Sequence, residues 1–339
     1  MNIRSISFPS VIEGHNTELV NVAKDHLNGL KISNGNSDYI VGNLALTEGR
    51  NPHKAINSSP DETDYQILIQ SALLLASKYI KEPMVITTGF PFSTINLNKD
   101  IAKEYLRSLE SIIYDSRPFG GPDHQVYQTS VNRIEIIPEL IAGIIAMRGG
   151  ELQKTGNFFM VSLGYGTIEI GLSTDGGIIQ RTEATGPGLR YAVDWAMKEM
   201  MQNYYVGLRT EHQFDYAFQR GHITTNRKRI DLSEIRQRAL HHYYKDVISP
   251  LMRNRWEDED FNRANSIVLV GGGALYPELL NHFTDEFNNF VNIEVADDPT
   301  SVASRGYCIR SRNIAGGGTE AAVGIDIGNA HTTVSVFDQ

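Results

Sequence analysis

Two segments of the chain place a glycine-bearing turn directly after an apolar strand pattern, an arrangement suited to holding phosphate groups. In the first, the strand ends at Asp326, and the turn comprises Gly328, Asn329, Ala330 and His331. In the second, the strand ends near Ser162, and the turn comprises Gly164, Tyr165, Gly166 and Thr167. Glycine permits backbone dihedrals and close approaches that let N–H groups face an anion. Since a hydrogen bond to a charged group contributes about 1.5 to 3 kcal/mol, a few of them can hold a triphosphate.

Carboxylates stand at the places where chemistry on that phosphate would occur. Asp326 ends a strand and is suited to hold Mg²⁺ through water, because this ion keeps much of its hydration shell. Ser162 is the corresponding position of the second turn. Glu139 follows a strand pattern and begins a helix. A glutamate there can take part in catalysis, or it can simply complement the helix dipole.

Further glycines lie in two other segments. Gly271, Gly272 and Gly273 separate a buried strand pattern from a helix pattern, so that backbone without side chains can pack against a nucleotide. The alternative is a loose connection. Gly186 and Gly188 precede another helix pattern.

Strand and helix patterns alternate along the chain, which predicts an α/β architecture with helices covering sheets. The expected strands include residues 3–8, 39–46, 84–88, 133–137 and 266–270. The expected helices include residues 62–79, 98–114, 139–147, 189–205, 276–287 and 300–312. Residues 206–262 are richer in charge and are expected to be helical.

An internal repeat indicates how the two turns are supported. Residues 158–182 repeat the strand, turn and strand pattern of residues 323–337. The final strand needs a partner, and Ile3 to Phe8 at the opposite end of the chain is the predicted one. Asp338 and Gln339 would then meet Met1 and Asn2 in a hairpin turn, and Ala315 to Thr319 would form a flexible bridge. We therefore expect a circular permutation, either engineered or natural.

The composition places the chain among globular proteins. Its 339 residues, 41% of them hydrophobic, suggest two domains with large cores. No apolar run or signal sequence indicates a membrane or secretion, so we expect a cytoplasmic protein. The net charge of −9 argues against a general nucleic-acid surface. Cys308 is expected to be a core residue, and Arg227-Lys228-Arg229 is either a solvated loop or a docking patch.

Four segments together resemble the actin-like ATPases, and most closely the ParM-type plasmid-segregation actins of bacteria and archaea. They are DIGNAHTT from Asp326, IIPELIAG from Ile136, SLGYGTIEI from Ser162 and VLVGGGALYPEL from Val268. The resemblance covers nearly the whole chain once the tail is placed before the head. It implies a two-domain, ribonuclease H-like fold with duplicated sheets, permuted in sequence.

The resemblance also divides the chain into expected parts. Domain I would cover residues 1–150, with a small inserted subdomain at about 15–82. Domain II would cover residues 151–299, with an inserted subdomain at about 206–262. Domain I would be completed by a helix at 300–312, a linker at 313–322 and the permuted hairpin at 323–339.

The function implied by the resemblance is ATP binding and hydrolysis with Mg²⁺, coupled to polymerisation into filaments. In the family, the residue matching Glu139 orients the attacking water, and the segments with Gly186, Gly188 and Gly271 to Gly273 lie near the nucleotide. The protein would bind itself, and an adaptor would link it to DNA, without direct contact to nucleic acid or membrane. Two departures are Ser162, where the family usually has aspartate, and Glu169, where it often has a shorter acid.

Two other functions are compatible with the same resemblance. A small-molecule kinase of the superfamily needs a base beside an acceptor hydroxyl, and no extra acid of that kind stands out in the turn segments. A non-polymerising ATPase scaffold is the second alternative.

Overall fold

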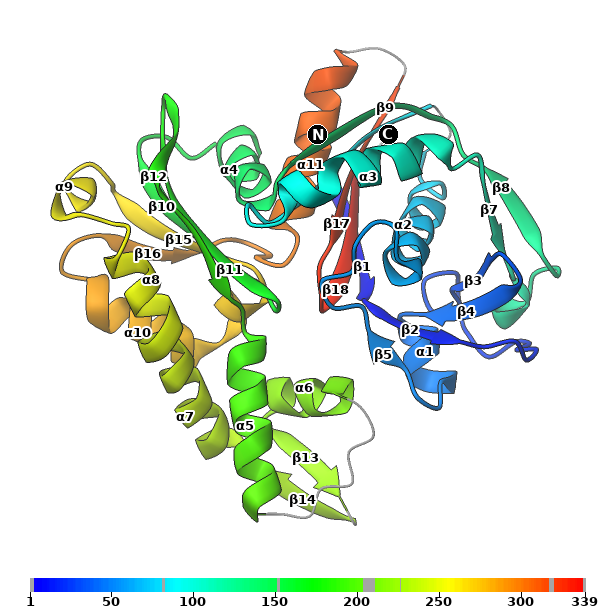
Figure 1. The fold of residues 1–339 in the computed structure, drawn as a ribbon, viewed down its shortest axis with the longest axis horizontal. Coiled ribbons are helices and arrows are strands. Elements are labelled where there is room, and N and C mark those ends of the chain that lie inside the picture. The colour runs from blue at the N-terminus through cyan, green and yellow to red at the C-terminus, as the bar shows by residue number, and fades with distance from the viewer. Residues whose placement is uncertain are drawn as a thin grey trace. The chain divides into compact units, whose positions relative to one another are not determined.

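The computed structural model describes residues 3–80, 83–150, 153–203, 211–225, 227–316 and 320–337. The chain forms two compact units, unit 1 with residues 1–154 and 301–339, and unit 2 with residues 155–300. Each unit contains its own five-stranded sheet (Figure 1). No helix in the described ranges is long and apolar enough to cross a membrane.

The sheet of unit 1 joins the two ends of the chain. Its strands, in spatial order, are β1 (Ile3–Pro9), β18 (His331–Phe337), β17 (Ala321–Ile327), β6 (Met84–Phe90) and β9 (Val131–Pro138). β1 and β18 are antiparallel, with Ile3 opposite Phe337, so the predicted pairing of tail and head is confirmed. The predicted hairpin turn at residues 338–339 and 1–2, and residues 317–319 of the predicted bridge, lie outside the described ranges.

The sheet of unit 2 repeats that of unit 1. Its strands, in spatial order, are β12 (Gly177–Pro187), β11 (Thr167–Thr174), β10 (Phe158–Leu163), β15 (Ser266–Val270) and β16 (Asn292–Val295). In both sheets the first three strands are antiparallel neighbours and the last two continue in parallel. The α/β fold class with duplicated sheet cores, which the resemblance implies, is therefore confirmed.

Helices cover both faces of the sheet in unit 1. They are α2 (Thr63–Ala76), α3 (Ile95–Ser108), α4 (Glu139–Gly149) and α11 (Val302–Ala315). Helices α2 and α3 share one apolar core with the sheet, and Gln70 of α2 donates a hydrogen bond to the Tyr105 hydroxyl of α3 at 2.7 Å. Helices α4 and α11 pack against each other. Cys308 of α11 is fully buried, and burial raises the pKa of its thiol to about 12, as fits a core residue.

A second sheet in unit 1 has six strands. In spatial order they are β5 (His53–Lys54), β2 (Val11–Gly14), β4 (Ser37–Val41), β3 (Lys31–Asn34), β7 (Ser111–Tyr114) and β8 (Gln125–Gln128). The strand expected at 39–46 stops at Val41, because Gly42 with φ 60° turns the chain into helix α1 (Asn43–Glu48). The helix expected at 98–114 stops at Ser108, since the β-branched pair Ile112-Ile113 continues as strand β7.

The helical region of unit 2 contains one feature that the sequence pattern did not predict. Its helices are α5 (Arg190–Asn203), α6 (Glu211–Arg220), α7 (Ser233–Tyr243), the π-helical turn η2 (Tyr244–Ile248), α8 (Ser249–Arg253), α9 (Asp258–Phe261) and α10 (Pro277–Phe287). Between α6 and α7 stands a hairpin of β13 (His222–Thr225) and β14 (Lys228–Asp231). The expectation of an all-helical segment at 206–262 was wrong there, because Arg227, with φ 62°, forms part of a turn.

Candidate nucleotide-binding site

One edge of the main sheet in unit 1 gathers the predicted acidic residues. Strands β17, β6 and β9 are parallel, so their carboxyl ends lie at the same edge. Asp326 is the penultimate residue of β17, and Glu139 begins helix α4 directly after β9. Thr88 lies near the end of β6, opposite Ile325. The topology therefore brings together two carboxyl groups that stand far apart in the sequence.

The electrostatics at this edge favour a cation. Burial, and then the negative charge of Glu139, raise the pKa of Asp326 well above its usual value. A positive ion beside the two groups would remove the repulsion and keep Asp326 ionised. The Thr88 hydroxyl is buried and has no hydrogen-bond partner among the described residues. Such an oxygen is free to bind a ligand or a ligand-bound water.

The residues present fit Mg²⁺ but not a metal held by protein ligands alone. Within the described ranges, no group of three or more His, Cys, Asp or Glu side chains is arranged to hold an ion. Mg²⁺ usually keeps several waters and binds one or two carboxylates together with substrate phosphates. Asp326 is the residue of this edge that would hold it.

The turn between β17 and β18 is fixed from two sides. The Ser10 hydroxyl donates to the Gly328 carbonyl oxygen at 2.5 Å, and the Ser10 amide donates to the Ala330 carbonyl oxygen at 2.9 Å. The Asn329 side chain exchanges two hydrogen bonds with Asn57, at 3.0 and 2.8 Å. Because the Asn329 side chain is hydrogen-bonded to Asn57, a phosphate would bind to the backbone N–H groups of this turn. His331, the first residue of β18, is exposed.

The matching turn of unit 2 is held by the segment that starts helix α5. The amides of Gly188, Leu189 and Arg190 donate to the carbonyl oxygens of Gly166, Gly164 and Tyr165, at 3.0, 3.0 and 2.9 Å respectively. A Cβ atom at Gly188 would lie 2.5 Å from both the Thr167 nitrogen and the Tyr165 oxygen. Only glycine fits this contact, and the turn and the helix start therefore form one structure.

The glycine triplet lies against the same turn. A Cβ atom at Gly271, which has φ 82°, would be 2.7 Å from the Leu163 oxygen, and one at Gly273 would be 2.7 Å from the Leu163 Cβ. Gly272 differs, because a Cβ atom there would meet nothing within 4 Å. The outer glycines pack against the strand end, whereas Gly272 faces open space where a ligand can approach.

The two hairpins place acid and hydroxyl groups in opposite order. Asp326 on β17 is opposite Thr333 on β18, whereas Ser162 on β10 is opposite Glu169 on β11. Glu169 is 1% exposed and accepts a hydrogen bond from the Thr185 hydroxyl at 3.3 Å. Each hairpin thus carries one carboxyl group at this register position, on different strands.

The structure groups most of the predicted residues within their own units. Unit 1 brings together the edge residues Asp326, Gly328, Asn329, Ala330, His331 and Glu139. Unit 2 brings together Ser162, Gly164, Tyr165, Gly166, Thr167, Gly188, Gly271 and Gly273. Gly186 lies farther back, opposite Ile168 on strand β11.

Three residues at these edges were missed by the sequence reasoning. Ser10 and Asn57 act through hydrogen bonds to segments distant in sequence, whereas Thr88 presents a buried hydroxyl that has no hydrogen-bond partner among the described residues. Ser10 and Thr88 did carry a signal, since the segments Phe8 to Ser10 and Thr88 to Phe92 both support the resemblance at predicted strand ends, but neither residue was given a role from it.

Comparison with known proteins identifies the fold. Residues 1–140 match the family of actin-like proteins, N-terminal domain. A 15-stranded ParM filament from Clostridium botulinum is 19% identical, with 90% of this chain and 92% of that chain covered and a TM-score of 0.74. A non-polymerisable quadruple mutant of pCBH ParM has the same identity and coverage, with a TM-score of 0.71. An archaeal actin homologue in complex with ADP is 18% identical over 91% of this chain and 92% of that one, with a TM-score of 0.65. A search of the curated proteins gives no match. The molecule has the actin-like fold.

Proposed function

We propose that this chain, an actin-like protein of the ParM type, binds and hydrolyses ATP with Mg²⁺ and assembles into filaments. The observation that carries the proposal is the pair of equivalent hairpins, each ending in a glycine turn at the carboxyl edge of its sheet. In unit 2 the contacts around that turn admit only glycine at Gly188 and Gly271. Two structures with the same fold, an archaeal actin homologue in complex with ADP and a ParM filament, support the choice of ligand and assembly.

Each residue has a distinct role in this proposal. The turns at Gly328 and Gly164 bind the phosphates through backbone N–H groups. Asp326 holds Mg²⁺ through its waters, and Glu139 orients the water that attacks the γ-phosphate. Gly272 lets the nucleotide approach the backbone after β15. In unit 2 the position that corresponds to Asp326 is Ser162. The carboxyl group at this level of the unit 2 hairpin belongs instead to Glu169, which is paired with Ser162 on the neighbouring strand.

The biological task that follows is the positioning or segregation of DNA through an adaptor protein. The net charge of −9 argues against direct binding of nucleic acid, and an adaptor supplies that contact instead. Self-association through two different surfaces gives an open filament when the rotation between successive subunits does not close into a ring.

Sedimentation and phosphate release, measured together with Mg²⁺ and ATP, test the proposal. We expect the protein to pellet when ATP is present and to release phosphate without an added acceptor. ADP formation that depends on a small hydroxyl compound would favour a kinase instead. Nucleotide binding with neither pelleting nor turnover would favour a non-polymerising scaffold.

A further inference from the structure

Two histidines lie side by side between helices α7 and α10 of unit 2. The ring centroids of His241, on α7, and His282, on α10, are 5.1 Å apart, and the ring planes are inclined by 52°. The two helices are neighbours in Figure 1. His241 is exposed and His282 is half-buried, so both rings can be reached from solvent. These two residues are called here the histidine pair, and the candidate nucleotide site does not use them.

The ring nitrogens of the histidine pair are not engaged by other polar groups. Neither His241 nor His282 makes a hydrogen bond or an ion pair with any described residue. Each neutral imidazole carries one nitrogen with a free lone pair, so the pair offers two such nitrogens to one space. Because neutral imidazole is the commonest metal ligand in proteins, this arrangement indicates a metal ion as the shared ligand.

The surroundings of His282 favour the form of the ring that binds metal. Tyr244 stacks on His282 with ring centroids 5.0 Å apart, which holds the plane of the imidazole. Burial, and then the charge of His241, lower the pKa of His282, whereas the charge of Asp285 acts in the opposite direction. Since a metal ion binds neutral imidazole, His282 needs to release no proton to bind one at neutral pH.

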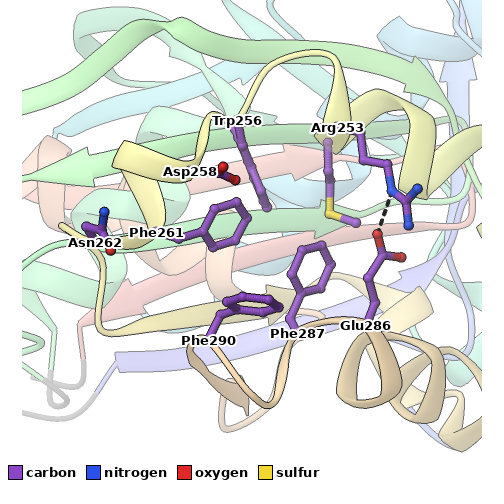
Figure 2. Close-up of a pocket in the computed structure, with 9 residues that line it drawn as sticks. Arg253, Trp256, Asp258, Phe261, Asn262, Glu286, Phe287 and Phe290 are labelled. Carbon is purple, nitrogen blue, oxygen red and sulfur yellow. Dashed lines mark hydrogen bonds and ion pairs between the residues drawn. The ribbon is translucent and has the colours of Figure 1, made fainter.

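Contacts on both sides of the histidine pair hold the two helices in place. About one turn before it, Arg236 of α7 donates to Glu278 of α10 at 2.8 Å. About one turn after it, the Tyr244 hydroxyl donates to Glu286 of α10 at 2.9 Å. The Glu286 carboxylate also accepts a hydrogen bond from Arg253 of α8 at 2.9 Å, the dashed line in Figure 2. An ion that bridges the histidines therefore costs little further ordering of the helices.

The separation of the two rings fits one ion with tetrahedral coordination. Zn²⁺ lies about 2.0–2.1 Å from an imidazole nitrogen, and therefore about 3.2 Å from the ring centroid. At a tetrahedral angle, two such rings have centroids about 5 Å apart, and the distance in the histidine pair is 5.1 Å. Rotation of an imidazole by half a turn about χ2 exchanges its nitrogen and carbon edges with little movement of the centroid, so each ring can turn a nitrogen toward the ion.

We propose that His241 and His282 bind a divalent transition-metal ion such as Zn²⁺ between α7 and α10. In the described part of the chain no three His, Cys, Asp or Glu side chains are arranged around an ion, so this one has two protein ligands and completes its coordination with water. Asp285, one turn after His282, is exposed and forms no ion pair with a residue that the structure describes, and its charge attracts the ion further. The bound ion joins α10 to α7 and thereby stabilises unit 2. This inference is independent of the proposed ATPase activity.

Calorimetric titration with ZnCl₂ tests the site, in nucleotide-free buffer with millimolar Mg²⁺ to occupy sites made of oxygen ligands. We expect the unmodified protein to bind Zn²⁺. His241→Ala and His282→Gln should each weaken that binding at least about tenfold, because even the loss of an outer-shell partner of a metal site has an effect of this size. His242→Ala is the matched control, since His242 packs against Trp195 at 4.7 Å and pairs with Asp246 at 3.6 Å, and its affinity should be unchanged.

Two further measurements distinguish an ion that bridges two helices from an ion on a single histidine. Zn²⁺ should raise the melting temperature of the unmodified protein and leave that of His241→Ala unchanged, because only the complete pair joins α7 to α10. Zn²⁺ affinity should fall at least about tenfold between about pH 7.5 and about pH 5.5, since protons compete for both imidazoles. The inference would be overturned if the unmodified protein bound no Zn²⁺, if both variants bound it equally well, if His242→Ala lost as much affinity as they do, or if the affinity did not depend on pH.

Discussion

Asp326 and Glu139 are far apart in the sequence, yet they meet at one edge of the unit 1 sheet, where burial and then the charge of Glu139 raise the pKa of Asp326. The parallel strands β17, β6 and β9 produce this proximity. Two carboxylates held close together repel each other, which disfavours the charged form of one of them. Their retention at this edge is understandable if a divalent ion is bound there in the working protein.

The first prediction concerns this pair without nucleotide. Asp326→Asn removes a like-charge interaction, so the apoprotein should become more stable by about 1 kcal/mol near pH 8. Mg²⁺ and ATP should then raise the melting temperature of the variant by much less than that of the unmodified protein, because the metal site is lost. Thermal unfolding with and without Mg²⁺-ATP measures both effects. Equal stabilisation of the two proteins would remove Asp326 from the metal site.

The second prediction separates catalysis from binding. Glu139→Ala should keep ATP affinity within a factor of about two but lower phosphate release about 100-fold, because no group then orients the water. Glu139→Gln is the matched control, since an amide can still orient water, and it should retain more turnover. Phosphate release and equilibrium binding are measured side by side. Unchanged turnover in Glu139→Ala would leave Glu139 only a structural role at the start of α4.

The third prediction distinguishes glycines that pack from the glycine that faces open space. Gly188→Ala forces a Cβ atom into the Thr167 backbone and should lower the free energy of unfolding by a few kcal/mol. Gly272→Ala meets no atom within 4 Å, so stability should be unchanged while ATP affinity falls. Chemical denaturation and nucleotide titration separate the two results. If Gly272→Ala binds ATP normally, the nucleotide does not approach this loop.

The fourth prediction is a pH dependence of stability from His26. This side chain is 9% exposed, stacks on Phe119 and has no hydrogen-bond partner for either ring nitrogen among the described residues. Burial, with the nearby Lys78, lowers the pKa of His26 to about 4. Between pH 6.5 and 4 the unfolded chain therefore binds a proton that the folded chain does not. The free energy of unfolding should decrease by about 3 kcal/mol as the pH falls through that window.

A variant isolates this contribution from other titrating groups. His26→Phe keeps an aromatic ring but cannot be protonated, so its stability should fall less between pH 6.5 and 4 than that of the unmodified protein. Denaturant unfolding at several pH values provides the comparison. Parallel curves for the two proteins would show that His26 is not the group responsible.

The fifth prediction concerns chain order. Ile3 opposite Phe337 means that a short loop can join the end of β18 to the start of β1. A rearranged chain that begins at Ala321, continues from Phe337 through a short loop into Ile3 and ends at Ala315 should fold and bind ATP with the same affinity. Circular dichroism and nucleotide titration check it. A rearranged chain that does not fold would show that the present order is required.

The sequence predicted the strands of the two main sheets better than the hairpin and the helix end outside them. The repeat of residues 158–182 and 323–337 was sufficient for both hairpins, because strand alternation and glycine turns are local signals. The β13–β14 hairpin was missed because both strands are short and β14 is charged. The end of the helix expected at 98–114 was misplaced because Ile112 and Ile113 suit a strand as well as a helix.

In the candidate site, too, local motifs could be predicted and long-range contacts could not. The glycine turns and the acids at strand ends were visible in the sequence, since each depends on its immediate neighbours. The partners that fix them, such as Ser10 on Gly328 and Asn57 on Asn329, depend on contacts across most of the chain. The occupation of the Asn329 side chain by Asn57 could not be read from a local pattern.

A crystal structure with Mg²⁺ and a non-hydrolysable ATP analogue tests the central claim most directly. The account predicts phosphate oxygens within hydrogen-bonding distance of the turns at Gly328 and Gly164, Mg²⁺ on the Asp326 side of the phosphates, and nucleotide against Gly272. A nucleotide bound elsewhere, or Mg²⁺ and phosphates without contact to either turn, would contradict it.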